Sequence, residues 1–155
     1  MNKNNQTPTY LANHCRVFFV FAGLSGAFSV LFSAWLAHAG SALVVDDQRR
    51  LFIALAMQFI HTLILVIVLI WIRINSQQHT NQDEERYERN RSKIRLNKFL
   101  LFTAYCFVIG VLCFSGVLYL KTFHLAGFLG KLAPFGGSTL ALGWLMLAVS
   151  AQLRN

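Results

Sequence analysis

The sequence predicts an all-α membrane protein: an integral bundle of four transmembrane helices with both termini in the cytoplasm. The first reason is composition, because hydrophobic residues make up 55% of the 155 residues, charged residues make up 13%, and the mean hydropathy is +0.50. A soluble domain carries roughly 25% charged residues, since its surface faces water. The second reason is that the charges are grouped, which leaves long stretches without Asp, Glu, Lys or Arg.

Four stretches without Asp, Glu, Lys or Arg are each long enough to cross a bilayer. The predicted spans are residues 17–38, 51–72, 99–120 and 132–153. A helix of this length covers roughly 33 Å, enough for a hydrocarbon core of ~30 Å. Strands are not expected, because the stretches lack apolar–polar alternation and an open sheet could not satisfy its backbone groups in lipid.

The first span has one rival interpretation, since Ala37-His38-Ala39 resembles a signal-peptidase site. A signal peptide has a short apolar region of about 7–15 residues. Here Val17 to Leu36 supplies 20 apolar or small residues after a lead of 16 residues. We therefore expect a helix that is retained in the protein.

Lys and Arg are unevenly divided between the two sides of the predicted bundle. Ten lie in the N-terminal tail (1–16), the central loop (73–98) and the C-terminal tail, and four lie in the other two connections. By the positive-inside rule, the tails and the central loop face the cytoplasm. The expected organisation is a cytoplasmic tail, 1–16, and a transmembrane domain, 17–155, in a bacterial inner (plasma) membrane as a multi-pass protein.

The central loop begins with acidic residues and ends with basic ones. This order suits a helix dipole, and no Gly or Pro interrupts residues 83–109, so we expect a charged helix that continues into the third span. Its basic end is a candidate for contact with anionic lipid headgroups. The residues concerned are Arg89, Arg91, Lys93, Arg95 and Lys98. The alternative is a solvated connector, and the neighbouring acids argue against a nucleic-acid partner.

Polar side chains inside the spans are costly, so each one needs an explanation. Counting depth along each span gathers five of them in the outer half: His38, Gln58, His61, Ser115 and Tyr119. They form either a small pocket for an ion, a proton, a lipid headgroup or a quinone-like ligand, or a network of interhelical hydrogen bonds worth about 0.6 kcal/mol each. The network is the favoured interpretation.

No cofactor or metal is expected. His38 and His61 differ in depth by roughly 15 Å, whereas two axial haem ligands need nearly equal depth. No carboxylate or CxxC motif accompanies the histidines, as a zinc site would require. Small residues in the spans are instead expected to let helices approach closely. The candidates for such packing are Ser29, Ser33, Gly116, Gly136 and Gly137.

Four short motifs are distributed over the spans. They are Ala37-His38, Gln58-Phe59-Ile60-His61, Phe114-Ser115-Gly116-Val117-Leu118-Tyr119, and Pro134-Phe135-Gly136-Gly137 with Gly143-Trp144 following. In these segments the chain resembles the family of small inner-membrane proteins called domain of unknown function 423 (UPF0382). It departs from that pattern where Ser33, Trp35 and Leu36 replace Gly, Phe and Gly. The resemblance implies a four-helix bacterial membrane protein and no particular activity.

The predicted function is that of a non-enzymatic membrane protein, an accessory or assembly component of a larger membrane complex. The spans carry no Asp or Glu, the groups that proton- and cation-coupled transporters use. No nucleophile–base–carboxylate set or phosphate loop is present either. The alternative is a binder or transporter of a small or lipid-like ligand. Expected partners are anionic membrane lipids and other membrane subunits or a second copy of the chain.

Overall fold

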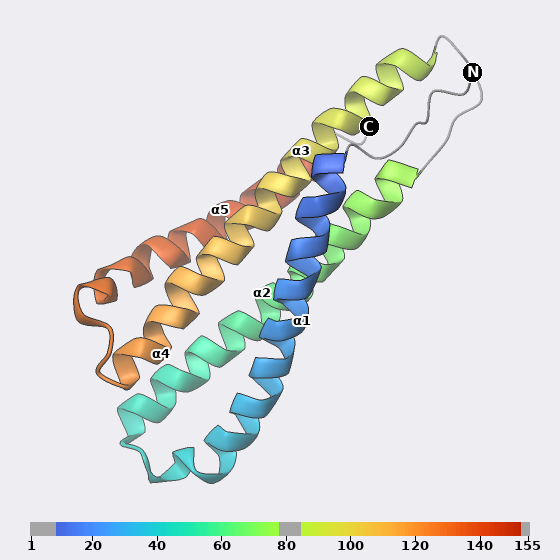
Figure 1. Cartoon of the computed structure of the whole chain (residues 1–155). Coiled ribbons are helices and arrows are strands. Elements are labelled where there is room, and N and C mark those ends of the chain that lie inside the picture. Colours follow the sequence, from blue (N-terminus) through green and yellow to red (C-terminus); the bar gives the residue numbers. More distant parts are fainter. Residues whose placement is uncertain (1–8, 78–84, 153–155) are drawn as a thin grey trace.

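The computed structural model describes residues 9–77 and 85–152, and this part of the chain is almost entirely helical. In chain order the elements are α1 (Thr9–His38), the 3-10 helix η1 (Gly40–Ala42), α2 (Val45–Gln77), α3 (Glu85–Val111), the π-helical segment η2 (Leu112–Gly116), α4 (Val117–Thr122), the 3-10 helix η3 (Gly127–Leu132) and α5 (Ala133–Gln152). Segments α3, η2 and α4 follow one another as a single rod (Figure 1).

Four helical stretches are long and apolar enough to cross a membrane: Tyr10–His38, Val45–Ser76, Arg91–Thr122 and Gly127–Gln152. This confirms the predicted all-α bundle of four transmembrane helices. The start of α1, the end of α2, the start of α3 and the end of α5 lie at one end of the molecule (Figure 1). We call it the terminal end, and the end that holds η1 and η3 is the turn end. Which of them faces the cytoplasm remains a prediction.

The helices extend beyond the predicted spans at the terminal end. α1 runs over Thr9–His38, whereas the predicted first span began at residue 17. α2 continues to Gln77 and α3 starts at Glu85, so both sides of the predicted loop 73–98 are helical. The expected charged helix feeding into the third span is therefore confirmed. Asn97 ties the two extensions together: it accepts from Asn75 at 2.7 Å and donates to Ser76 at 3.0 Å.

The two turns at the other end are closed by local hydrogen bonds. Gln48 Nε2 donates to the carbonyls of Ser41 and Leu43, which satisfies the bend between η1 and α2. At the end of α4, His124 has a φ of 59°, and the backbone N–H of Leu125 bonds the Leu120 carbonyl at 2.8 Å. His124 in the left-handed conformation, together with this bond, forms a helix C-cap of the kind usually built on Gly. His124 therefore ends the third span rather than joining the other histidines.

The middle of the bundle is made by α2 and α3, with α1 packed on α2 and α5 packed on α3. The difference in burial is large: half of the most apolar stretch of the third span is buried, against 22% for α1 and 17% for α5. The core lies along α2 and α3, where Leu69, Leu100 and Phe107 are fully buried. α1 and α5 therefore present most of their surface to lipid or to another chain.

Candidate functional site

A layer of polar side chains crosses the interior of the bundle between α1 and α2. Gln58 Nε2 donates to the carbonyl oxygen and to Oγ of Ser25, both at 3.1 Å. The same Ser25 Oγ lies 2.8 Å from Thr62 Oγ1. All three residues are buried. Because hydrogen-bond partners are scarce in lipid, these bonds hold α1 and α2 in one register.

His61 extends this layer toward α5. Its Nδ1 lies 2.7 Å from the Met57 carbonyl, and its Nε2 accepts a hydrogen bond from Trp144 Nε1 at 3.2 Å. An indole N–H can only donate, so Nε2 is unprotonated and the proton of a neutral imidazole sits on Nδ1, which donates to Met57. The ring is also flanked by Phe107, with centroids 5.7 Å apart. Both nitrogens of His61 are thus engaged within the chain.

Ser115 and Tyr119 belong to the same region but have buried oxygens without a hydrogen-bond partner among the described residues. Seven other hydroxyls in the described helices donate to the carbonyl four residues earlier: those of Ser29, Ser76, Thr103, Thr122, Ser138, Thr139 and Ser150. Ser115 lies within the π segment η2. A π turn is wider and its backbone bonds reach five residues back, so the carbonyl four residues back is out of place for this hydroxyl.

Register places Ser115 at the same depth as Gln58. The Asn75–Asn97 bond fixes how the antiparallel α2 and α3 rods face each other. Eighteen residues along each rod from that bond lie Ser115 and Met57, and equal helical rise puts them level. The unpartnered Ser115 hydroxyl is therefore in the layer of Gln58 and His61. Tyr119 lies one turn nearer the turn end, with its ring edge-on to Phe32 of α1 at 5.0 Å.

His38 does not join this group. It is exposed at the last turn of α1, where its backbone carbonyl accepts a bond from Ser41. Thirteen residues of helix separate it from Ser25, which is about 20 Å. Over residues 9–77 and 85–152, no group of three or more His, Cys, Asp or Glu could hold a metal.

The sequence is similar to a known family of membrane proteins. Residues 32–137, about two thirds of the chain, match the model of the family described as "Protein of unknown function (DUF423)". The chain belongs to this family. It is also 27% identical over 133 residues to a "UPF0382 membrane protein" of Haemophilus influenzae (strain ATCC 51907 / DSM 11121 / KW20 / Rd), covering 84% of this chain and 90% of that protein. No solved structure matches the chain.

Three of the four motifs that carry the resemblance to the DUF423 family meet in the fold, whereas Ala37-His38 lies apart at the end of α1. Gly136 faces the backbone of the π segment so closely that an added Cβ would lie 2.6 Å from the carbonyl carbon of Cys113. Seven residues on, Gly143 faces the ring of Phe107. This close approach brings the neighbouring Trp144 to His61. Trp144 was not among the residues predicted to contact His61, although the sequence carried a signal for it: Gly143 precedes Trp144 within a span, and a glycine there lets the helix of Phe107 approach closely.

The other predicted packing residues of this DUF423 member differ in burial and in how closely another helix approaches them. Ser29 is buried and donates to the Ser25 carbonyl at 2.9 Å, whereas Ser33 is exposed and donates to the Val30 carbonyl. A Cβ on Gly116 would meet no atom within 4 Å, and one on Gly137 would make an ordinary contact with the Phe114 ring at 3.6 Å.

The basic end of α3 lies at the terminal end of the molecule. Arg91, Arg95 and Lys98 are exposed, and Lys93 is half-buried. Arg89 lies in the first turns of α3, outside the residues whose side chains the structure describes.

Proposed function

We propose that this chain is a non-enzymatic subunit of a larger membrane complex and that it meets its partner through the outer face of α1. The observation that carries this proposal is a row of small exposed residues on an edge helix. Gly23, Ala27 and Ala34 are spaced four and seven residues apart, so they share one face of α1. No atom lies within 4 Å of a Cβ built on Gly23. Such a face permits the close helix approach that drives association in lipid.

The non-enzymatic part of the proposal rests on how the reactive side chains are used. Both nitrogens of His61 and the amide of Gln58 are hydrogen-bonded inside the chain. A general acid or base needs a lone pair or proton directed at a substrate. His61 instead links α2 to α5, and Gln58 links α2 to α1. Both side chains therefore have a structural role in holding the helices together.

The test is Gly23→Leu, with Val17→Phe as a matched bulky change at an exposed position on another face of the same helix. Removing a helix-interior Gly favours the helix by up to ~1 kcal/mol, so the Gly23 variant should fold at least as well as wild type. We expect a partner chain to co-purify stoichiometrically in mild detergent with wild type and Val17→Phe, and to be lost with Gly23→Leu. A wild-type protein that purifies from its native membrane as a monomer without partners would refute the proposal.

A second function is favoured by one specific observation, the unpartnered hydroxyls of Ser115 and Tyr119. Two buried hydroxyls beside a π segment could receive a small polar ligand, because π segments are frequent at functional sites. Ser115→Ala and Tyr119→Phe remove the two oxygens without adding bulk. If a ligand binds there, both variants lose a small molecule that co-purifies with wild type. If the hydroxyls are merely tolerated, both variants are as stable as wild type or more stable, and no bound molecule changes.

We also propose a location in a bacterial inner membrane, with the terminal end in the cytoplasm and the exposed bases Arg91, Arg95 and Lys98 near anionic headgroups. The support is the excess of Lys and Arg at that end and a bacterial membrane protein as relative. A fluorescent protein that matures only in the cytoplasm, fused after residue 155, should fluoresce. A periplasmic phosphatase fused at the same place should be inactive. The opposite pair of results would invert the topology.

A further inference from the structure

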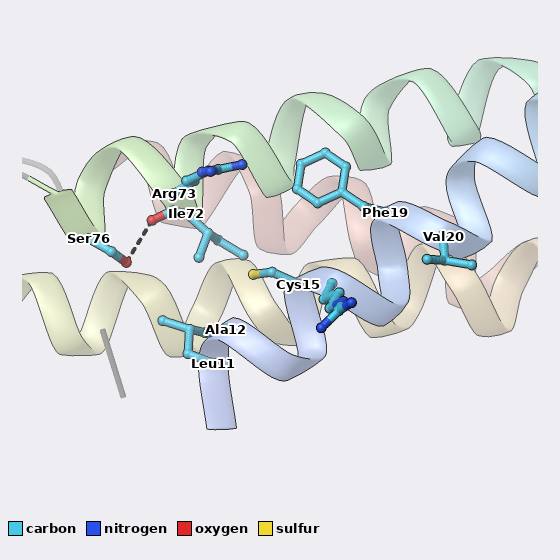
Figure 2. A pocket seen from close by; sticks show the side chains of 9 residues that line it. Leu11, Ala12, Cys15, Phe19, Val20, Ile72, Arg73 and Ser76 are labelled. Carbon is cyan, nitrogen blue, oxygen red and sulfur yellow. Dashed lines mark hydrogen bonds between the residues drawn. The ribbon is translucent and has the colours of Figure 1, made fainter. Parts of the chain in front are cut away.

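A groove lies between the N-terminal half of α1 and the last turns of α2, at the terminal end (Figure 2). Its cavity is about 670 Å³, within the roughly 300–1,000 Å³ typical of small-molecule sites. Most of its lining is apolar, and the rest includes two arginines. The lining residues are Leu11, Ala12, Cys15, Arg16, Phe19, Val20, Ile72, Arg73 and Ser76. The groove is separate from the polar layer around His61.

The two arginines mark one depth in the membrane. Arg16 is the last charged residue before the first uncharged stretch, and Arg73 is the first one after the second stretch. The bond between Ser25 and Thr62 fixes the antiparallel register of α1 and α2. Counting from that bond, nine residues along α1 and eleven along α2, puts the two positions within about 3 Å of each other in depth. Both guanidinium groups thus stand at the boundary between the apolar core and water.

Both guanidinium groups are available to a ligand. Arg16 and Arg73 are exposed, and neither has a hydrogen bond or ion pair within the described part of the chain. Two like charges beside one groove repel each other unless an anion lies between them. Ser76, by contrast, already donates its hydroxyl hydrogen bond to the Ile72 carbonyl at 2.8 Å (Figure 2). The groove therefore combines net positive charge with an apolar wall.

The apolar wall continues from the arginines toward the bilayer. Phe19 and Val20 of α1 lie on the side of the groove that leads into the span (Figure 2). Val20 is 58% exposed, so a chain running along this wall would touch both protein and lipid. An occupant must therefore be apolar at the depth of Phe19 and anionic at the depth of Arg73. A free phosphate ion matches only the second requirement.

We infer that this groove is a binding site for one anionic phospholipid, with its phosphate between Arg16 and Arg73 and one acyl chain along Phe19 and Val20. Arginine suits the headgroup because its planar fork makes paired hydrogen bonds to phosphate oxygens. This site is independent of the α1 association face proposed above, because Gly23, Ala27 and Ala34 are not part of its lining.

The experiment is native mass spectrometry of the full chain, titrated with phosphatidylglycerol or with phosphatidylcholine of the same acyl chains. Wild type should hold one phosphatidylglycerol molecule more tightly than any further one, and should bind phosphatidylcholine weakly. The double variant Arg16→Gln/Arg73→Gln should weaken that first binding roughly thirtyfold, as expected for two bases at a membrane surface. Since both side chains are exposed and without a bond in the described residues, this variant should keep the wild-type melting temperature.

Two controls locate the effect. Arg49→Gln/Lys121→Gln removes the same charge from exposed positions at the turn end, outside the groove, and should change the first binding less than threefold. Ala12→Trp fills the groove from an exposed position and should weaken phosphatidylglycerol binding while both arginines remain. Inorganic phosphate at millimolar concentration should not compete.

Three results would overturn the proposal. Equal losses in the Arg16/Arg73 and Arg49/Lys121 variants would mean that only diffuse surface charge attracts the lipid. Unchanged binding in Ala12→Trp would mean that the groove takes no acyl chain. Full competition by inorganic phosphate would mean that the two arginines hold a free anion.

Discussion

The contact between α5 and the π segment can be tested through three glycines with graded surroundings. A Cβ on Gly136 would press on the backbone nitrogen of Phe114 and lie 2.6 Å from the carbonyl carbon of Cys113. The Cβ of Gly137 would reach only the Phe114 ring, at 3.6 Å, and that of Gly116 would meet nothing within 4 Å. Substitution by Ala should therefore give three different outcomes, although the chemical change is identical.

The magnitude for Gly136→Ala follows from geometry. Carbon atoms are in good contact at about 3.5–4.0 Å, so α5 must retreat by about 1 Å from backbone atoms that cannot rotate away. A gap of that size forfeits a quarter to a half of the dispersion energy at neighbouring contacts, and overpacking typically costs about 1–3 kcal/mol. After the helix-propensity gain of up to ~1 kcal/mol, we expect a net loss of about 1–2 kcal/mol.

Gly116→Ala gains the propensity without a clash, so it should be stabilising by up to ~1 kcal/mol. Gly137→Ala should fall between the two variants, because its contact with Phe114 is of ordinary length. The assay is reversible unfolding from mild detergent into SDS, followed by circular dichroism, with free energies taken from the transitions. Equal stability of Gly136→Ala and Gly116→Ala would refute the packing described here.

Three further predictions concern the polar layer. The imidazole of His61 should be the Nδ1–H tautomer, visible in its ¹⁵N shifts, and an Nε2–H signal would contradict the bond from Trp144. Trp144→Phe keeps an aromatic ring but removes the donor, and it should lower the free energy of unfolding by about 0.6–1.7 kcal/mol; no change would mean that this bond is absent. Gln58→Leu should cost about 1 kcal/mol, and a double-mutant cycle with Ser25→Ala should show coupling near 0.6 kcal/mol. Strictly additive effects in that cycle would mean that the Gln58–Ser25 side-chain bond does not stabilise the protein.

Much of the fold could be predicted because lipid imposes strong rules on a sequence. The absence of charge in residues 51–72 and 99–120 follows directly from the cost of an ion in hydrocarbon, and the need to satisfy every backbone group leaves only the helix. The segregation of acids and bases between α2 and the third span also predicted the helical start of α3. These are local properties, readable without knowing which helix touches which.

The partners of each side chain could not be predicted in the same way. Depth counting grouped Gln58, His61 and Ser115, and the register of the helices agrees with that grouping. It did not reveal that Trp144 would satisfy His61, because a partner on another helix depends on rotation about the helix axis as well as on depth. Nor did it separate His38, which lies on the exposed side at the end of α1.

The sequence by itself thus determined the membrane environment and the number of spans, since these depend on the free energy of transferring each residue into lipid. Only the tertiary structure decided that Ser115 would lose its local acceptor in a π turn. It also decided that Gly136 would admit the third span's backbone, and that Arg16 and Arg73 would share one groove. The physical reason is that hydropathy acts on a residue wherever it packs, whereas hydrogen bonds, close contacts and paired charges depend on helix rotation and register. Those are set by the whole bundle together.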